Sequence, residues 1–213
     1  MNQNGGSCVI EINHIVFDIG KVLIAYDTEI PYLRLIPDEA ERRHFLAEIC
    51  SPAWNIEQDR GRTWEEAEEE LIALHPGKVS LIRAFRQNWH HMVGPAMDDV
   101  VAIMRRFIAD GHDVTLLTNF ASDTYRESLK RFAFLNEARG VTVSGDAKLI
   151  KPDPAIYQLH AATFDLVPEK TLFIDDSLPN ILAAHSCGWH GVHFTGGAAL
   201  EAELGRFRFV KAG

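Results

Sequence analysis

The chain has 213 residues, 46% of them hydrophobic and 24% charged, and this ordinary composition excludes collagen-like, low-complexity and largely disordered proteins. Lysine and arginine number 21 and aspartate and glutamate 30, so the formal net charge is −9, which disfavours nucleic acid as a partner because phosphate binding draws on a basic surplus. The 3 cysteines, Cys8, Cys50 and Cys187, have neither metal-ligand nor redox spacing, which disfavours a zinc site or a disulfide framework.

The first residues, Met1–Ser7, are polar and glycine-rich, without the basic and apolar regions of a signal peptide. No run in the sequence approaches the ~20 apolar residues that a membrane-spanning helix needs. We therefore expect a cytoplasmic protein without a membrane partner. The oligomeric state leaves no signal in the sequence.

The first predicted element is a strand over Ile12–Phe17, an apolar run without the polar alternation of a half-exposed strand. The segment from residue 27 to residue 95 contains no convincing strand. Instead, an acidic stretch, Thr63–His75, and an aromatic-rich stretch, Ala84–Met92, predict helices. We therefore expect a small helical cap over residues 27–95, inserted into a core made of residues 1–26 and 96–213.

The rest of the chain alternates helices with apolar runs. Helices are predicted over Met97–Asp110 and Pro154–Asp165, and a third begins at Ser177 and ends at Gly188. The further predicted strands are Val114–Thr118, Gly140–Ser144, Thr171–Ile174 and Gly191–Phe194. This alternation implies right-handed crossovers, so the predicted fold class is α/β, a doubly wound parallel sheet.

Polar side chains follow the strands at the sheet edge where open parallel sheets bind ligands. They are Asp18, Thr118, Asn119, Lys151, Asp175 and Asp176. Clustered carboxylates repel one another unless a cation lies among them, and oxygen ligands favour Mg²⁺ over zinc. A lysine and a hydroxyl beside the metal suit a substrate anion, and a carboxylate there could attack phosphorus. The pattern therefore predicts a magnesium-dependent site for a small phosphorylated metabolite.

Four ordered motifs resemble those of the haloacid dehalogenase (HAD) superfamily, over essentially the whole chain. They are Phe17–Leu23, Leu116–Asn119, Lys151–Tyr157 and Phe173–Ser177. The resemblance implies a HAD-like Rossmannoid core whose first strand lies in the middle of five, with the second and third strands on one side and the fourth and fifth on the other. The insertion after the first motif resembles the helical cap of the branch that contains dehalogenases and many sugar-phosphate phosphatases.

The resemblance also implies roles for the residues of these motifs. Asp18 would be the nucleophile, and Thr118 would hold the phosphoryl group, helped by the backbone after it and conceivably by Asn119. Lys151 would neutralise the nucleophile and the transferring group. The implied metal shell consists of Asp18, the backbone carbonyl of Gly20, Asp175 and Asp176.

Gly20 departs from the pattern that the resemblance implies. Family phosphatases usually carry an aspartate at this position, two residues after the nucleophile, which serves as general acid and base. Loss of such help typically costs ~10²–10⁴ in rate. Asp27 is a conceivable substitute, but it is better interpreted as a polar turn residue at the entry to the cap.

The same glycine keeps two other functions open. The family's haloacid dehalogenases also lack the second aspartate, and they use the nucleophile, here Asp18, to displace halide from carbon without a metal. They typically lose the first acidic residue of the fourth motif, whereas this chain keeps Asp175 beside Asp176, which favours a phosphatase over a 2-haloacid dehalogenase. A non-catalytic binding module on the same scaffold would have no need of the retained polar residues.

The stretch Trp54–Gly61 mixes aromatic, amide and cationic groups just before a predicted helix of the cap, and is a candidate for substrate selection. Arg60 could contact a substrate anion, and Gly61 could allow a tight turn before the predicted helix. The alternative, that Arg60 is a solvated ion-pair residue and Trp54 belongs to the core of the cap, is slightly favoured.

Overall fold

Buried apolar strands form the centre of the molecule. The structure, a computed structural model, describes residues 10–211. Its central parallel sheet contains β2 (His14–Phe17), β5 (Asp113–Thr118), β6 (Val141–Val143), β7 (Thr171–Asp175) and β8 (His190–His193). The strands are ordered β6-β5-β2-β7-β8, so the predicted α/β class and the predicted strand order, with the first strand in the middle, are both confirmed.

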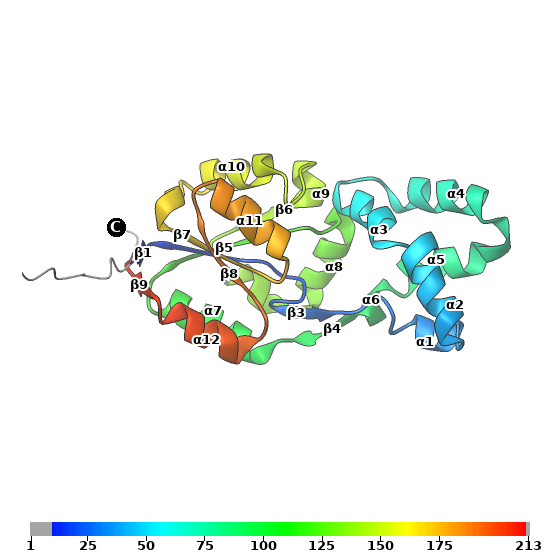
Figure 1. Ribbon diagram of the computed structural model, residues 1–213, viewed down its shortest axis with the longest axis horizontal. Coiled ribbons are helices and arrows are strands. Elements are labelled where there is room, and N and C mark those ends of the chain that lie inside the picture. The colour runs from blue at the N-terminus through cyan, green and yellow to red at the C-terminus, as the bar shows by residue number, and fades with distance from the viewer. Residues whose placement is uncertain (1–9, 212–213) are drawn as a thin grey trace, which may run out of the picture.

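Helices cover both faces of this sheet because successive side chains of a strand point to opposite faces. Figure 1 shows α10 and α11 on one side of the sheet and α7 and α12 on the other. Val16, Leu117 and Phe173 belong to the apolar cluster on the first side, and Ile15 and Leu116 belong to the cluster on the second. The helices around the sheet are α7 (Asp98–Ala109), α8 (Ser122–Arg131), α9 (Ser144–Ala147), α10 (Pro154–Thr163), α11 (Leu178–Ser186) and α12 (Gly197–Leu204).

Residues 32–92 form a helical lobe at one end of the molecule, away from β1 and β9 (Figure 1). Its helices are α1 (Tyr32–Leu35), α2 (Glu39–His44), α3 (Pro52–Asp59), α4 (Trp64–Leu74), α5 (Val79–Gln87) and α6 (Trp89–Met92). The predicted helix at 63–75 is confirmed, and Thr63 caps it in a capping box with Glu66. The predicted helix at 84–92 is wrong in its bounds, because the chain leaves the helical conformation at Asn88. The division into a core and a cap stays a prediction.

Two short ribbons correct the predicted strands. The segment 27–95 does contain a strand, β4 (Val93–Ala96), which pairs antiparallel with β3 (Ile24–Tyr26) between the sheet and the helical lobe. The predicted strand Ile12–Phe17 is divided between two sheets, since β1 (Ile10–Ile12) leaves β2 and pairs with β9 (Phe207–Phe209). Both ribbons depend on partners far away in the sequence, which a local apolar pattern does not reveal.

Within residues 10–211, no helix combines the length and the apolar character needed to cross a bilayer. Within the described residues, Cys50 is a buried free thiol and Cys187 a half-buried one. The expectations for Met1–Ser7 and Cys8 fall outside the described residues.

Candidate active site

The parallel register of the central strands brings the predicted polar residues to one edge of the sheet. Phe17 of β2 is paired with Leu116 of β5 and with Ile174 of β7, so the three strands end side by side. Asp18 therefore follows β2 at the level where Thr118 ends β5 and Asp175 ends β7. The backbone N–H of Asp18 donates to the carbonyl of Ile174 at 2.9 Å, which fixes the first of these residues on the neighbouring strand.

Lys151 lies in the middle of this group and is 1% exposed. Its Nζ is 2.9 Å from Asp18 Oδ1 and 2.6 Å from Asp175 Oδ2. The same ammonium donates to the backbone carbonyl of Leu117 at 3.0 Å, so its three donors all have partners. A buried ammonium between two carboxylates is a neutralising group for a site that handles negative charge.

The carboxyl of Asp18 titrates abnormally in this setting. Burial raises the pKa of Asp18, the Lys151 ammonium opposes that shift, and the Asp175 carboxylate adds to it. For Lys151 itself, burial acts to lower the pKa, but Asp18 and Asp175 outweigh burial and raise it above its ordinary value. The ammonium therefore stays charged, and the carboxylates around it outnumber this one positive charge.

Three carboxylates form a candidate cation site. Asp18, Asp175 and Asp176 each offer a ligand oxygen, and these oxygens all lie within 4.8 Å of one another. Asp175 is held in place by hydrogen bonds to Oδ1 from the backbone N–H of Ser177 at 2.8 Å and from Asn180 at 3.0 Å. Burial raises the pKa of Asp176, and Asp175 adds to that shift, which is the repulsion a divalent cation would relieve. The donor set is all oxygen, so the site fits Mg²⁺.

Thr118 presents an unpaired donor to the site. Its hydroxyl is buried and has no hydrogen-bond partner among residues 10–211. A buried hydroxyl without a partner costs free energy unless a ligand completes it. The position of this group at the end of β5 fits the predicted contact with a phosphoryl oxygen.

The side chain of Asn119 holds the backbone of Lys151. Its amide nitrogen donates to the backbone carbonyl of Lys151 at 2.9 Å, and its amide oxygen accepts from the backbone N–H of Lys151 at 2.8 Å. Both ends of the amide are therefore engaged in fixing the loop that carries Lys151. Asn119 is therefore a positioning residue for Lys151, and its contact with the phosphoryl group stays a prediction.

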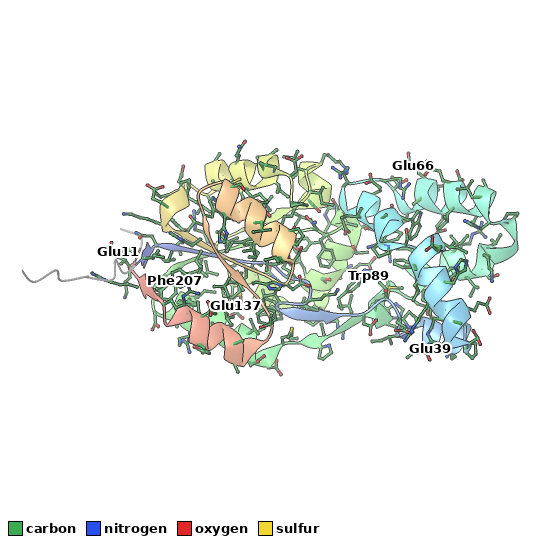
Figure 2. The ribbon with its side chains drawn as sticks, viewed as in Figure 1. Glu11, Glu39, Glu66, Trp89, Glu137 and Phe207 are labelled. Carbon is green, nitrogen blue, oxygen red and sulfur yellow. The ribbon has the colours of Figure 1, made fainter. Side chains whose placement is uncertain are left out.

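An aromatic cavity of about 80 Å³ adjoins the loop after β2. Gly20 and Asn119 line it from the sheet, and Asn55, Asp59 and Thr124 also border it. Its other walls are apolar: Ile24, Tyr26, Trp64, Trp89, Val93 and Phe120. Trp89 belongs to α6 and lies on the side of the helical lobe that is nearest the rest of the molecule, as Figure 2 shows. A wider opening of about 450 Å³ shares Tyr26, Asn55 and Asp59 with this cavity.

The predicted substrate contact Arg60 does not line the cavity. Its guanidinium is exposed and lies 3.5 Å from Glu57 on the same helix, so the solvated ion-pair interpretation agrees with the structure. Gly61 does form the expected turn, with a φ of +104°. Trp54 packs edge-on against Phe85 and Trp64 inside the lobe. Asp27 accepts from the backbone N–H of Glu29 at 2.8 Å, as a turn residue does.

The cavity residue that sequence reasoning missed is Asp59, the neighbour of Arg60. The sequence offered one usable signal, since both residues lie in the stretch singled out for substrate selection. The choice between them depends on which way the last turn of α3 faces, and successive helical residues point about 100° apart.

Comparisons with known proteins agree on one family. The family model of the haloacid dehalogenase-like hydrolases matches residues 12–188. Among curated proteins, a phosphoserine phosphatase of Thermus thermophilus is 29% identical over 119 residues, which cover 55% of this chain and 47% of that protein. The sesquiterpene phosphatase astK of Aspergillus oryzae is 26% identical over 105 residues, which cover 49% of this chain and 54% of that protein. The chain thus matches about half the length of these curated relatives.

Solved structures share the fold. A HAD family enzyme of Bacteroides thetaiotaomicron is 21% identical with a TM-score of 0.69, covering 88% of this chain and 95% of that one. The same enzyme was crystallised in complex with magnesium and inorganic phosphate. The L-2-haloacid dehalogenase of Xanthobacter autotrophicus, with chloropropionic acid covalently bound, is 17% identical with a TM-score of 0.63, covering 91% of this chain and 82% of that one. At these identities the likeness establishes the fold, which phosphatases and dehalogenases have in common.

Proposed function

This chain belongs to the haloacid dehalogenase-like hydrolases, and on that premise we propose that it is a magnesium-dependent phosphatase that forms an aspartyl-phosphate on Asp18. The observation that carries the proposal is the cluster of Asp18, Asp175 and Asp176 around the buried ammonium of Lys151. A dehalogenase that works without a metal gains nothing from three neighbouring carboxylates that repel one another. The two phosphatases among the relatives support the same activity.

Each residue of the site has its own role in the proposed phosphoryl transfer. Hydrogen bonds to Asp18 Oδ1, from the N–H of Ile19 at 2.7 Å and from Lys151, orient the carboxylate toward the substrate. Its attack forms an oxygen–phosphorus bond while the bond from phosphorus to the leaving alcohol breaks. A water molecule then attacks the phosphorus of the aspartyl-phosphate, which restores the Asp18 carboxylate and releases inorganic phosphate. The Thr118 hydroxyl and the Lys151 ammonium hold the charged phosphoryl oxygens throughout.

Asp18, Asp175, Asp176 and the carbonyl of Gly20 would hold the magnesium ion. When bound, Mg²⁺ neutralises the carboxylates and the phosphoryl oxygens, which lets two negatively charged partners approach one another. In the same proposal residues 27–95 act as a cap that closes the site, since Trp64 and Trp89 of the helical lobe line the cavity beside Gly20.

The proposed activity requires metal-dependent release of phosphate. We expect the protein to release phosphate from p-nitrophenyl phosphate with Mg²⁺ and to lose that activity with a chelator. Asp176→Asn is expected to raise the Mg²⁺ concentration for half-maximal activity by roughly tenfold or more, because ligand charge sets cation affinity. Asp176 is preferred to Asp175 for this change because Asp175 also pairs with Lys151, which complicates its replacement.

Asp98→Asn is the matched control, since Asp98 is an exposed carboxylate in the first turn of α7. It should leave the metal dependence unchanged. Chloride release from 2-chloropropionate without metal, with phosphate esters untouched, would assign the chain to the dehalogenases instead. A protein that catalyses neither reaction, whatever the metal, would favour the binding module.

The walls of the cavity support a narrower substrate class. We propose that the leaving group is uncharged and apolar next to the phosphate. Of the lining residues that the structure describes, none is a lysine, arginine or histidine, so the cavity offers no cation to a carboxylate of the leaving group. Burying an unpaired carboxylate against aromatic side chains costs several kcal/mol. The cavity therefore suits a substrate like that of the sesquiterpene phosphatase better than phosphoserine.

This substrate class predicts a preference between two primary alkyl phosphates of similar size. We expect kcat/KM for 3-methylbutyl phosphate to exceed that for phosphoserine by roughly 10²-fold or more, because the phosphoserine carboxylate would lose its hydration without a partner. Phosphate release under identical conditions measures both. Equal or reversed values would refute the apolar leaving group while leaving the phosphatase activity itself intact.

A further inference from the structure

Gly20 leaves the loop after Asp18 without a side chain that could donate a proton. The backbone does not demand glycine there, because its φ lies outside the left-handed region and a Cβ would meet no heavy atom within 4 Å. The space beside Gly20 is instead part of the aromatic cavity, and the carboxyl that borders this cavity comes from the helical lobe. That carboxyl belongs to Asp59, the last residue of α3.

The end of α3 is fastened to the edge of the sheet. The backbone carbonyl of Asp59 accepts a hydrogen bond of 2.6 Å from the hydroxyl of Ser144. This fully buried hydroxyl also accepts from the backbone N–H of Phe120 at 2.8 Å. Phe120 follows Thr118 and Asn119, so one side chain ties Asp59 to the loop that carries the phosphoryl-binding hydroxyl. The backbone at Asp59 is thereby held next to the loop that follows β5.

A second fastening holds the residues that follow Asp59. The ammonium of Lys148, just after α9, donates to the carbonyl of Gly61 at 3.2 Å. Gly61 has a φ of +104°, a backbone conformation that other residues rarely adopt. The turn after α3 therefore depends on a glycine.

From this placement we propose that Asp59 is the general acid and base of the reaction, in the role that Gly20 leaves empty. The proposal rests on the phosphatase function proposed above. As the bond from phosphorus to the leaving oxygen breaks, the Asp59 carboxylic acid gives its proton to that oxygen and becomes a carboxylate. In the second step the carboxylate takes a proton from the attacking water, which regenerates the acid as phosphate leaves Asp18.

The surroundings of Asp59 suit a group that alternates between its two forms. Burial is the main cause that raises the pKa of Asp59 to about 7, and the Asp18 carboxylate raises it as well. The backbone N–H of Ala121 and the Lys151 ammonium act in the opposite direction and lower this pKa. On the lobe side of the sheet, the phenol of Tyr26 borders the same cavity and stays neutral, because burial and the Asp59 charge both raise its pKa. A carboxyl with a pKa near neutrality exchanges protons most efficiently at neutral pH.

The test compares leaving groups that need different amounts of protonation. Asp59→Asn should lower kcat for 3-methylbutyl phosphate by roughly 10²–10⁴-fold, because an alkoxide is a poor leaving group without a proton. The loss for p-nitrophenyl phosphate should be less than about tenfold, since nitrophenolate leaves without one. The matched control is Asp27→Asn, which removes a charge from the turn at the entrance to the lobe and should spare both substrates.

A double variant separates proton donation from a merely structural role. Adding Gly20→Asp to Asp59→Asn places a carboxyl on the opposite wall of the cavity, where a side chain has room. Compared with Asp59→Asn alone, the double variant should hydrolyse the alkyl phosphate at least tenfold faster and p-nitrophenyl phosphate at a similar rate. A lost fold would not be repaired in this selective way.

The outcomes keep the two proposals apart. If the unmodified protein hydrolyses neither ester with Mg²⁺, the phosphatase function fails, and the role of Asp59 fails with it. If it hydrolyses them but Asp59→Asn lowers both rates equally or neither, the phosphatase stands and Asp59 is not the proton donor. The same conclusion follows if Asp27→Asn, and not Asp59→Asn, shows the dependence on the leaving group.

Discussion

Asp18→Asn is expected to lower kcat for every phosphate ester by roughly 10⁴-fold or more, since removing a catalytic nucleophile has effects of at least this size. An amide cannot form the aspartyl-phosphate, so protonation of the leaving group becomes irrelevant. The nitrophenyl and alkyl esters should therefore lose activity together, in contrast to the selective loss expected for Asp59→Asn. Steady-state phosphate release from both esters measures this difference.

The fold should survive this change. In the variant Lys151 keeps its contacts with Asp175 at 2.6 Å and with the carbonyl of Leu117 at 3.0 Å. The buried ammonium thus retains one carboxylate and one carbonyl partner, and circular dichroism and Tm should show a folded protein. Asp98→Asn, the same chemical change on the exposed face of α7, should retain full activity. Full phosphatase activity in Asp18→Asn would contradict the assignment of the nucleophile.

The central strands were predictable because each carries its own signal, whereas their order came from the resemblance to the HAD superfamily. β2, β5 and β7 are buried along nearly their whole length, so their sequences are mostly apolar and lack strict alternation. The ribbon of β3 and β4 has no such signal. β4 contains Gly94 and Pro95, and a Cβ at Gly94 would lie 2.9 Å from that of Ala25, so the glycine serves a close approach between segments far apart in sequence. Nothing local in the sequence reports that approach.

The site, like the fold, contains residues that the sequence predicts and residues that it does not. Asp18, Thr118 and Asp175 were predictable because parallel strands bring their ends to one edge, whatever the helices do. The contact of Asn119 with the phosphoryl group stays a prediction, because a side-chain amide serves a loop as readily as a ligand, and here the backbone of Lys151 engages both ends of it. Asp59 was missed because its position depends on Ser144, which is 85 residues away in the sequence.

Lys151→Met is expected to have the largest effect on stability, because it removes the charge while nearly preserving side-chain volume. Asp18 and Asp175 would be left as buried carboxylates without their shared partner, and breaking a buried ion pair in this way typically costs about 3–5 kcal/mol. Phosphatase activity should fall as well, since the ammonium also neutralises the phosphoryl group. Urea unfolding gives the change in free energy, and Lys130→Met, the same replacement on the exposed face of α8, should change it little.

The pH dependence of that loss identifies its cause. Burial already raises the pKa of Asp18, and Lys151 opposes the shift, so the pKa rises further in the variant. When the pKa of a carboxyl is higher in the folded than in the unfolded protein, the free energy of unfolding decreases as pH rises above about 4, the ordinary pKa of this carboxyl in an unfolded chain. The deficit of Lys151→Met relative to the unmodified protein should therefore be larger at pH 8 than at pH 5. Mg²⁺ should recover part of the loss at pH 8, because a bound cation supplies the missing positive charge. A deficit independent of both pH and Mg²⁺ would mean that Lys151 stabilises the fold through packing and not by neutralising the carboxylates.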